Sequence, residues 1–442
     1  MRRLAAAALL LGACGGAGDL PTNDKGPIEA DPEPVPMEEQ VVETAAKETF
    51  TAKKGLSTER IAALEPAVPA REGRTPVQLP KEDRYTQTAA FLESFLKKRA
   101  TDPDNPWAIG HGMLALGPDL VLSNGRPAVD HLFETYAERF EVQGHGFVRF
   151  PRKRGTQRIE PHAALMLKAM TESGVSPERA VTVQGTPATV ADLWRGVLIS
   201  SSVDLKSGNA SFSSPNDMPW ALQSLAAWAP PNASGDLLWE AKDGTQMSLQ
   251  EFSVLNTTVL MAESQPLFDT MQAGAALEKR GQGVYQFTCG GAHLLQGTAY
   301  AIGRGYSTPL ASKAMPGQVA LMFWRLPAEL KIYDDLMRRI EKDEHLVMLL
   351  VQRLKFTGHF LETMHKMATM GLFSPTPEQA KMMQGAADQV ALTVQGLQSR
   401  GVYDNLDALR KTNEQLYLDV IGDSAHALHG LKLAMGEDGV RY

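Results

Sequence analysis

The sequence predicts an all-α fold, an (α/α)6 toroid-like array of helical hairpins with a few short strands, over residues 82–442. The first observation behind this prediction is that most of the region has apolar residues at helical spacing. The second is an internal repeat: GTPATVADL at 185–193 and GTQMSLQEF at 244–252 share the pattern G-T-x-x-[ST]-[VL]-x-[DE]-[LF]. In this pattern Gly makes a turn, and Ser or Thr with an acid three residues later forms a helix capping box. Repeats of this kind are typical of stacked helical hairpins.

A third, degraded copy of the repeat lies at 125–133 (GRPAVDHLF), and the three copies follow one another at similar intervals. A helix is expected before each copy, and these helices are placed at 107–116, 161–173 and 218–228. The repeating unit is therefore a helix, then a turn or short hairpin, then a second helix.

The segment 1–13 has the pattern of an export signal. Arg2 and Arg3 supply the positive charge, and Leu4–Leu11 is an apolar run too short to span a bilayer, which takes about 20 residues. The small residues Gly12 and Ala13 then lead directly into Cys14.

Leu11-Gly12-Ala13-Cys14 resembles the lipobox of bacterial lipoproteins. This resemblance implies that the leader is removed before Cys14, that Cys14 is acylated, and that the lipid anchors the protein in the membrane of the cell envelope. Residue 15 is Gly rather than Asp, which favours the outer membrane. The alternative is an ordinary secretory signal that happens to contain a cysteine.

The segment 14–81 is predicted to be a flexible, acidic and Pro-rich linker that carries the lipidated cysteine, although 57–64 could form a short helix. The formal net charge of the chain is −7, and loss of Arg2 and Arg3 with the leader would lower it by two, to −9. An exported acidic protein is a poor partner for nucleic acid, so nucleic-acid binding is not expected.

The linker is followed by a first helix at 85–100, and the second half of the chain continues the helical pattern. The helices expected there cover 248–274, 289–304, 326–341, 343–371, 376–399 and 405–435. Short strands are expected near 120–122, 147–150 and 180–183.

Each predicted first helix of a hairpin carries an aromatic or polar side chain near its start or middle. These side chains are Trp107, His111, His162, Trp220, Cys289, His293, His359, His426 and His429. One such marker follows the next along the chain at intervals of about one helical hairpin, at positions 111, 162, 220, 293, 359 and 426. Six hairpins closed into a ring would place these residues on inner helices that line a central cleft.

Four of these segments, CGGAHLLQGTAYAIGRGY (289–306), HGMLALG (111–117), PHAALML (161–167) and LKFTGHFLE (354–362), resemble the α/α-toroid proteins of the squalene-cyclase and prenyltransferase superfamily. The resemblance covers most of 100–436 and implies a toroid. The DxDD and DDxxD motifs of that superfamily are absent from the sequence. The resemblance therefore does not imply cyclase chemistry for this chain, and no catalytic residue of that superfamily can be assigned to a position in this sequence.

Cys289 and His293 place a thiol and an imidazole at i and i+4, which is one helical turn. They could be half of a metal site, or a nucleophile with its base, or a buried cysteine at a glycine-rich helix contact. His359 and Glu362 share a helix face, so that a carboxylate could orient the imidazole, whereas His365 diverges from His359 by about 120°.

His426 and His429 form an i, i+3 pair that could supply two metal ligands or pocket donors. The candidate metal ligands are therefore Cys289, His293, His426 and His429, although no cofactor is strongly implied. His131, His145 and His345 lie in polar contexts and are expected to be incidental.

Three classes of function remain open. The first is a membrane-anchored cell-envelope lipoprotein whose central cleft holds a ligand or partner, such as a glycan, a lipid or a protein. The second is an envelope enzyme, acting on a glycan or an isoprenoid, that uses the Cys289 and histidine cluster with or without a metal. The third is a helical-repeat scaffold that has no small-molecule site.

Overall fold

The computed structural model describes residues 54–442, except for 70, 81, 205–208, 211–216, 231–235, 279–287, 307 and 341–342. The predicted signal peptide, Cys14 and the linker as far as residue 53 lie outside the described residues. The described chain is predominantly helical, with short two-stranded sheets, so the all-α prediction is confirmed.

The helices are α3 (Thr58–Ala62), α4 (Asp83–Arg99), α5 (Pro106–Leu116), α6 (Ala128–Tyr136), α7 (Leu165–Ser173), α8 (Val190–Ser200), α9 (Met218–Trp228), α10 (Leu249–Gln272), α11 (Ala292–Gly303), α12 (Pro309–Met337), α13 (Asp343–Thr369), α14 (Pro377–Ser399), α15 (Leu406–Thr412) and α16 (Glu414–Ala434), with a 3-10 turn, η2, at Thr288–Gly291. The strands form antiparallel pairs: β1 (Glu72–Gly73) with β12 (Val440–Arg441), β2 (Glu138–Val142) with β3 (His145–Arg149), β4 (Lys153–Arg154) with β5 (Gln157–Arg158), β6 (Ala180–Val183) with β7 (Thr186–Thr189), β8 (Val203–Asp204) with β9 (Asn209–Ala210), and β10 (Leu238–Glu240) with β11 (Gln246–Ser248).

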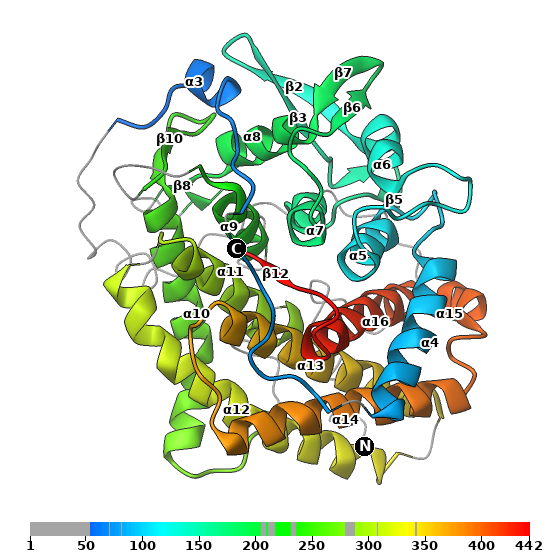
Figure 1. The fold of residues 1–442 in the computed structure, drawn as a ribbon. Coiled ribbons are helices and arrows are strands. Elements are labelled where there is room, and N and C mark those ends of the chain that lie inside the picture. The colour runs from blue at the N-terminus through cyan, green and yellow to red at the C-terminus, as the bar shows by residue number, and fades with distance from the viewer. Residues whose placement is uncertain are drawn as a thin grey trace, which may run out of the picture.

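Six helices pack against one another in succession. α5 contacts α7, α7 contacts α9, α9 contacts α11, α11 contacts α13 and α13 contacts α16, while α16 returns to contact α5. Figure 1 shows these six helices around the centre of the view, with α4, α10, α12 and α14 outside them. These inner helices are the ones predicted to carry the candidate site residues.

The two clear copies of the repeat form the predicted turn, strand and capped helix. In the first copy Thr189 caps α8, and Asp192 completes a reciprocal capping box. In the second copy the Ser248 hydroxyl accepts a hydrogen bond from the amide of Glu251 at the start of α10. Each helix is preceded by an antiparallel hairpin, β6–β7 or β10–β11. The repeat prediction is confirmed for both copies.

The third copy differs from the other two. Its helix, α6, begins after Pro127, and no side chain caps it. The strand expected at 120–122 is reduced to one isolated bridge between Val121 and Pro127. Without Ser or Thr at the cap position, this copy keeps the turn and the helix but loses the capping box.

Three predicted helix boundaries are wrong for identifiable reasons. α12 begins at Pro309 rather than 326. Proline usually breaks a helix, but Pro316 and Pro327 both lie inside this one. α7 begins at 165 rather than 161, because Ala164 has a left-handed conformation with φ of 63°. The helix expected at 405–435 is two helices, because Asn413 ends α15 and caps α16.

The folded domain begins earlier than the predicted boundary at residue 82. The segment after Lys54 packs on the helices: Leu56 bridges to Trp239, and Ile61 on α3 is fully buried. β1 then pairs with β12, so that Glu72 lies opposite Arg441 near the end of the chain. The apolar residues of this segment are too sparse to stand out from a linker in the sequence, which is why the boundary prediction was wrong.

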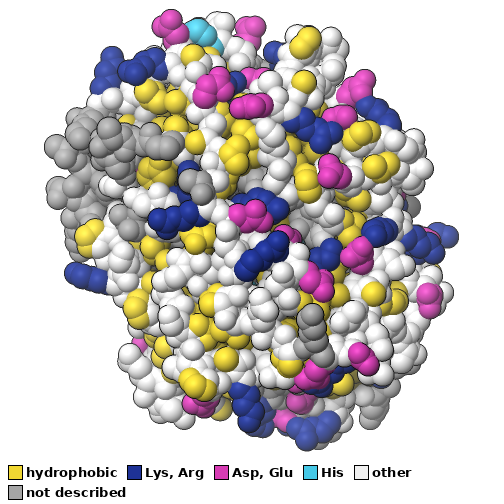
Figure 2. Space-filling model, in the orientation of Figure 1, with side chains coloured by type: hydrophobic (Ala, Val, Ile, Leu, Met, Phe, Trp, Pro, Cys, Tyr) yellow, Lys and Arg dark blue, Asp and Glu magenta, His cyan; other side chains and the backbone are white. Residues whose placement is uncertain are grey.

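The core is one large apolar cluster that runs through the helical array, with a smaller cluster between α10 and α12. None of the described helices is both long enough and apolar enough to cross a membrane. Figure 2 shows acidic and basic side chains interspersed over one face, so neither sign of charge forms a continuous field there.

Gly196 on α8 allows that helix to lie directly against β3, because a Cβ atom at this position would overlap the backbone carbonyl oxygen of Val148. We therefore expect Gly196→Ala to lower the free energy of unfolding by about 1–3 kcal/mol, the usual range for overpacking. Gly385→Ala on α14 is the matched control, because its Cβ meets nothing within 4 Å and alanine favours a helix. Thermal unfolding of both variants checks this, and an unchanged Gly196→Ala would contradict the close packing.

Candidate metal centre and adjoining pocket

The inner helices bring five aromatic rings together in the interior: His111 from α5, Trp220 from α9, His293 from α11, His359 from α13 and His426 from α16. The ring centre of His293 lies 4.8 Å from that of Trp220, 5.2 Å from that of His359 and 5.5 Å from that of His426. The His426 ring lies 4.0 Å from His359 and 5.5 Å from His111. Residues from both ends of the helical domain therefore share one buried cluster.

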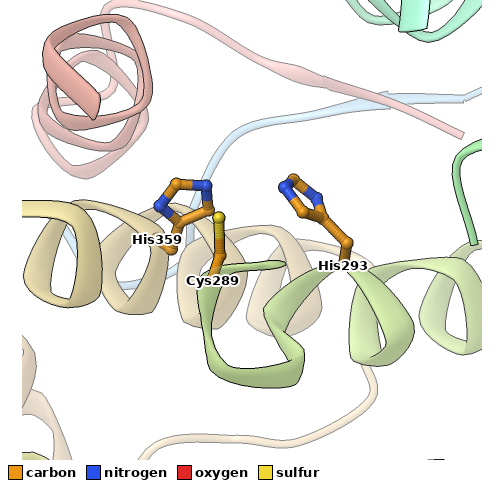
Figure 3. Close-up of side chains that lie close together, drawn as sticks. All are labelled: Cys289, His293 and His359. Atoms are coloured by element: carbon orange, nitrogen blue, oxygen red, sulfur yellow. The ribbon is translucent and has the colours of Figure 1, made fainter. Parts of the chain in front are cut away.

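Cys289, His293 and His359 form a triad of possible metal ligands within this cluster. Each offers one ligand atom, and these atoms all lie within 4.8 Å of one another. Cys289 lies on the 3-10 turn η2 and His293 on the first turn of α11, while His359 reaches over from α13. Figure 3 shows the sulfur of Cys289 between the two imidazole rings, with all three side chains pointing into the same space.

Hydrogen bonds to ring nitrogens set the orientation of the imidazoles. The Nδ1 atom of His359 donates to the backbone carbonyl of Lys355 at 2.8 Å, and that of His111 donates to the carbonyl of Trp107 at 2.9 Å. A carbonyl oxygen can only accept, so Nδ1 carries the proton and Nε2 keeps its lone pair. Nε2 of His359 and Nδ1 of His293 are buried and, among the described residues, have no hydrogen-bond partner.

Burial also keeps these rings neutral. It lowers the pKa of His293 and of His359 well below the ordinary value for histidine, and the neighbouring imidazoles act in the same direction. Burial likewise lowers the pKa of His111 and of His426. Neutral imidazole is the form that coordinates a metal ion.

A buried ionic network centred on Glu362 of α13 adjoins the rings through His426. Its carboxylate accepts from Nδ1 of His426 at 2.7 Å, from Nδ1 of His429 at 2.9 Å and from the ammonium of Lys366 at 2.6 Å. Lys366 also donates to Glu172 on α7 at 2.6 Å, and Glu172 accepts from Lys168 at 3.0 Å. Burial alone would raise the pKa of Glu362, but Lys366 and His426 hold it well below the ordinary value.

The same balance holds at Glu172, where burial raises the pKa but the two lysines outweigh it and bring the pKa to about 2. Lys366 is in turn held in its charged form, since the two carboxylates raise its pKa despite the cost of burial. Two amides complete the surroundings: Gln296 accepts from Lys366 at 3.2 Å, and Gln223 donates to Glu172.

Two further groups of possible metal ligands share residues with this network, and the carboxylates of both groups already bind other side chains. Glu172, Glu362 and His429 could form one group, but the Lys366 ammonium lies between the two carboxylates and already supplies the positive charge. His359, Glu362 and His426 could form another, but Glu362 binds His426 directly through a hydrogen bond. The triad of Cys289, His293 and His359 is therefore the best candidate for a metal centre.

A pocket adjoins the triad and shares His293 with it. Its polar lining is His111, Lys168, Trp220, His293 and His426, and the remaining lining is apolar or glycine. The pocket measures about 230 Å³ when the open space at its mouth is counted, and its enclosed part has room for about one water molecule.

The other predicted site residues lie in different surroundings. His162 sits at the edge of the cluster, where its ring centre is 4.7 Å from that of Trp220 and its Nδ1 lies 3.2 Å from a carboxylate oxygen of Asp217. His365 faces away from the cluster and hydrogen-bonds Thr75 at 2.7 Å, as its divergence from His359 predicted.

Two details of the sequence prediction need correction. Glu362 orients His426 and His429 rather than His359, because α16 packs against the face of α13 that carries the carboxylate. His429 consequently faces Glu362 and does not join His293 as a metal ligand. His131, expected in a polar or loop context, is buried on α6 against the carbonyl of Pro103, away from the cluster.

Lys168, Glu172 and Lys366 were not predicted from the sequence. Each belongs to an i, i+4 pair of opposite charge, Lys168 with Glu172 and Glu362 with Lys366. Such pairs are most often solvent-exposed. The available signal was their position inside otherwise apolar helices, with Met166, Leu167 and Met170 around the first pair and Met364 and Met367 around the second.

Comparisons with protein-family models, with curated proteins and with solved structures found no match to this chain.

Lys366 joins two buried carboxylates, so replacing it with an apolar residue should destabilise the folded protein. We expect Lys366→Met to lower the free energy of unfolding by about 3–5 kcal/mol, the usual effect of breaking a buried ion pair. Lys331→Met on α12 is the matched control: Lys331 also pairs with an acid at i+4, Asp335, but its side chain is 75% exposed. Its loss should cost less than about 1 kcal/mol. Urea unfolding of both variants checks this, and equal effects would show that the network is not a stabilising one.

Proposed function

We propose that this chain is a lipid-anchored protein of the cell envelope whose helical domain binds a transition metal ion and a small ligand in its interior. The single observation that carries the metal proposal is the meeting of a thiol with two imidazoles, each of which has one buried ring nitrogen that lacks a hydrogen-bond partner among the described residues. A buried polar atom left unpaired costs about 1–3 kcal/mol, and metal coordination would remove that cost.

The proposed architecture is an (α/α)6 toroid. The circuit of contacts from α5 through α16 and back to α5 supports it, as does the placement of the five clustered rings on five of those six helices. The likeness to the squalene-cyclase and prenyltransferase superfamily remains a proposal about architecture alone, because the acidic motifs of that chemistry are absent.

The donor set fits a metal ion of the zinc class. Zinc is bound by Cys sulfur at about 2.3 Å and by His nitrogen at about 2.0–2.1 Å, which puts tetrahedral ligand atoms about 3.3–3.7 Å apart. The three ligand atoms here lie within 4.8 Å of one another, so side-chain shifts of about 1 Å would complete the geometry. His359 already has the backbone carbonyl partner that metal-bound histidines commonly have.

The favoured function is binding of a ligand in the pocket beside the metal. An enzyme is the second candidate, and the observation that favours it is the number of ligands: three protein side chains leave one tetrahedral position open. A zinc ion with an open position supplies Lewis acidity and an activated water at neutral pH. Hydrolytic and lyase reactions on envelope glycans or isoprenoids are therefore the reactions to screen.

A scaffold without a small-molecule site is the weakest of the three classes. Buried histidines, lysines and glutamates carry desolvation costs that apolar side chains would avoid. A protein that only stacks helical hairpins does not need polar groups from several helices to converge beside a pocket.

Mass spectrometry of the metal content tests the central proposal. The purified full chain should carry about one zinc or iron ion per molecule, and His293→Ala or His359→Ala should lose it because each removes one of only three ligands. His345→Ala is the matched control, since His345 lies on the same helix as His359 and pairs with Glu344 instead. It should keep the metal.

Two outcomes would contradict the metal proposal. One is a chain that takes up neither zinc nor iron(II) in stoichiometric amount when both are supplied. The other is equal metal content in His293→Ala and in the unaltered chain, which would place the ion elsewhere.

Membrane anchoring is tested at Cys14. We expect Cys14→Ser to abolish incorporation of labelled fatty acid and to leave the precursor uncleaved, because the cysteine thiol is the acylation site that the lipobox implies. The control is Cys289→Ser, whose cysteine is buried within the folded domain and should not change the labelling. Labelling that persists in Cys14→Ser would refute lipidation at this residue.

A further inference from the structure

The pocket beside the triad has an unusual balance of hydrogen-bonding groups. Among its described lining residues there is no carboxylate, and Lys168 is the one side chain that carries a full charge. The imidazoles of His111, His293 and His426 line the same pocket. The pocket therefore favours a negatively charged occupant.

Trp220 supplies a donor that needs an acceptor. Its side chain is 2% exposed, and its Nε1 atom has no hydrogen-bond partner among the described residues. An indole N–H can only donate. The rings of His162 and His293 pack edge-on against the indole, with ring centres 4.7 and 4.8 Å away, and hold it in place.

Lys168 supplies the second donor. It is 2% exposed, and among the described residues its ammonium group donates one hydrogen bond, to Glu172 at 3.0 Å. An ammonium group has three donors, so two are without a partner among these residues, and Lys168 lines the pocket. Glu172 also binds Lys366 at 2.6 Å, so its negative charge is shared between two lysines.

The size of the pocket restricts what these donors can hold. The enclosed part has room for about one water-sized group, and Leu114 and Leu165 form part of the wall. A planar carboxylate can insert one oxygen into such a space, whereas a tetrahedral phosphate presents three oxygens around a bulkier centre.

We propose that Trp220 and Lys168 form a binding site for the carboxylate group of a small ligand, which they hold beside the Cys289, His293 and His359 triad. The proposal rests on the proposed function in one respect: the metal ion of the triad is the group that the bound ligand would coordinate or react with. The binding of the carboxylate itself requires only the two donors. The ligand class is thus a small carboxylic acid, or a larger molecule that ends in one.

Nitrogen-15 NMR of the indole groups tests the site directly. The full chain has six tryptophans, and the Trp220 Nε1–H signal can be assigned by its loss in Trp220→Phe. Titration with formate should move this signal downfield in a saturable manner, because the indole then donates to a charged oxygen. The Trp194 signal is the internal control: its Nε1 is also buried without a partner among the described residues, but Trp194 does not line the pocket.

The role of Lys168 is tested by Lys168→Met, which should weaken formate binding about tenfold or more, since a hydrogen bond to a charged group is lost. Unchanged affinity in this variant would overturn the assignment of Lys168. If the variant does not fold, the titration of the unaltered chain still decides the proposal, because a Trp220 signal that does not respond to formate contradicts the site.

Two comparisons complete the test. Chloride at the same ionic strength should not move the Trp220 signal, and a shift with chloride equal to that with formate would overturn a specific site. Phosphate that binds more tightly than formate would overturn the carboxylate class.

The titration is run on both the metal-free and the zinc-loaded chain, which separates this proposal from the metal proposal. Zinc uptake without a formate response refutes the carboxylate site and leaves the metal centre standing. A formate response in a chain that takes up no metal refutes the metal centre and leaves the carboxylate site standing.

Discussion

The interior of this protein depends on the carboxylate of Glu362. It is fully buried, and its two oxygens bind His426 and His429 on α16 and Lys366 on its own helix. A buried charge is tolerated only when it is paired and hydrogen-bonded, so α16 can take only the position that brings both histidines to α13. Lys366 also binds Glu172, and this contact restricts the position of α7 relative to α13. Of the clustered imidazoles, His426 is held in place directly by this set of contacts.

The helical content and the hairpin repeat were predictable because they depend on local interactions. Thr189 with Asp192, and Ser248 with Glu251, are close in the sequence, and the capping contacts they make need no knowledge of the rest of the fold. The long helix α12 was partly missed because Pro316 and Pro327 normally break a helix, and only the surrounding tertiary packing makes them acceptable.

The residue types of the candidate site were predictable, but their pairing was not. His111, Trp220, His293, His359 and His426 were identified from their spacing, and all five meet in the interior. Which histidine Glu362 would bind depends on which face of α13 receives α16, and no local pattern encodes that choice. Lys168 and Lys366 were overlooked because a lysine one helical turn from a glutamate has the same sequence pattern on a solvated surface as in a core.

The return of α16 to α5 has a consequence for how the molecule is made. Synthesis proceeds from the amino end, and α16 with β12 is the last part of the described chain to appear. Until then α5 lacks one of its neighbours, Glu362 lacks both histidines, and β1 has no strand to pair with. A nascent chain can stack hairpins one after another, but it cannot bury its charged centre before the final helix arrives. The interval between the first hairpin and the last is therefore the period in which the exposed core is most open to aggregation, and in which a chaperone would have most to protect.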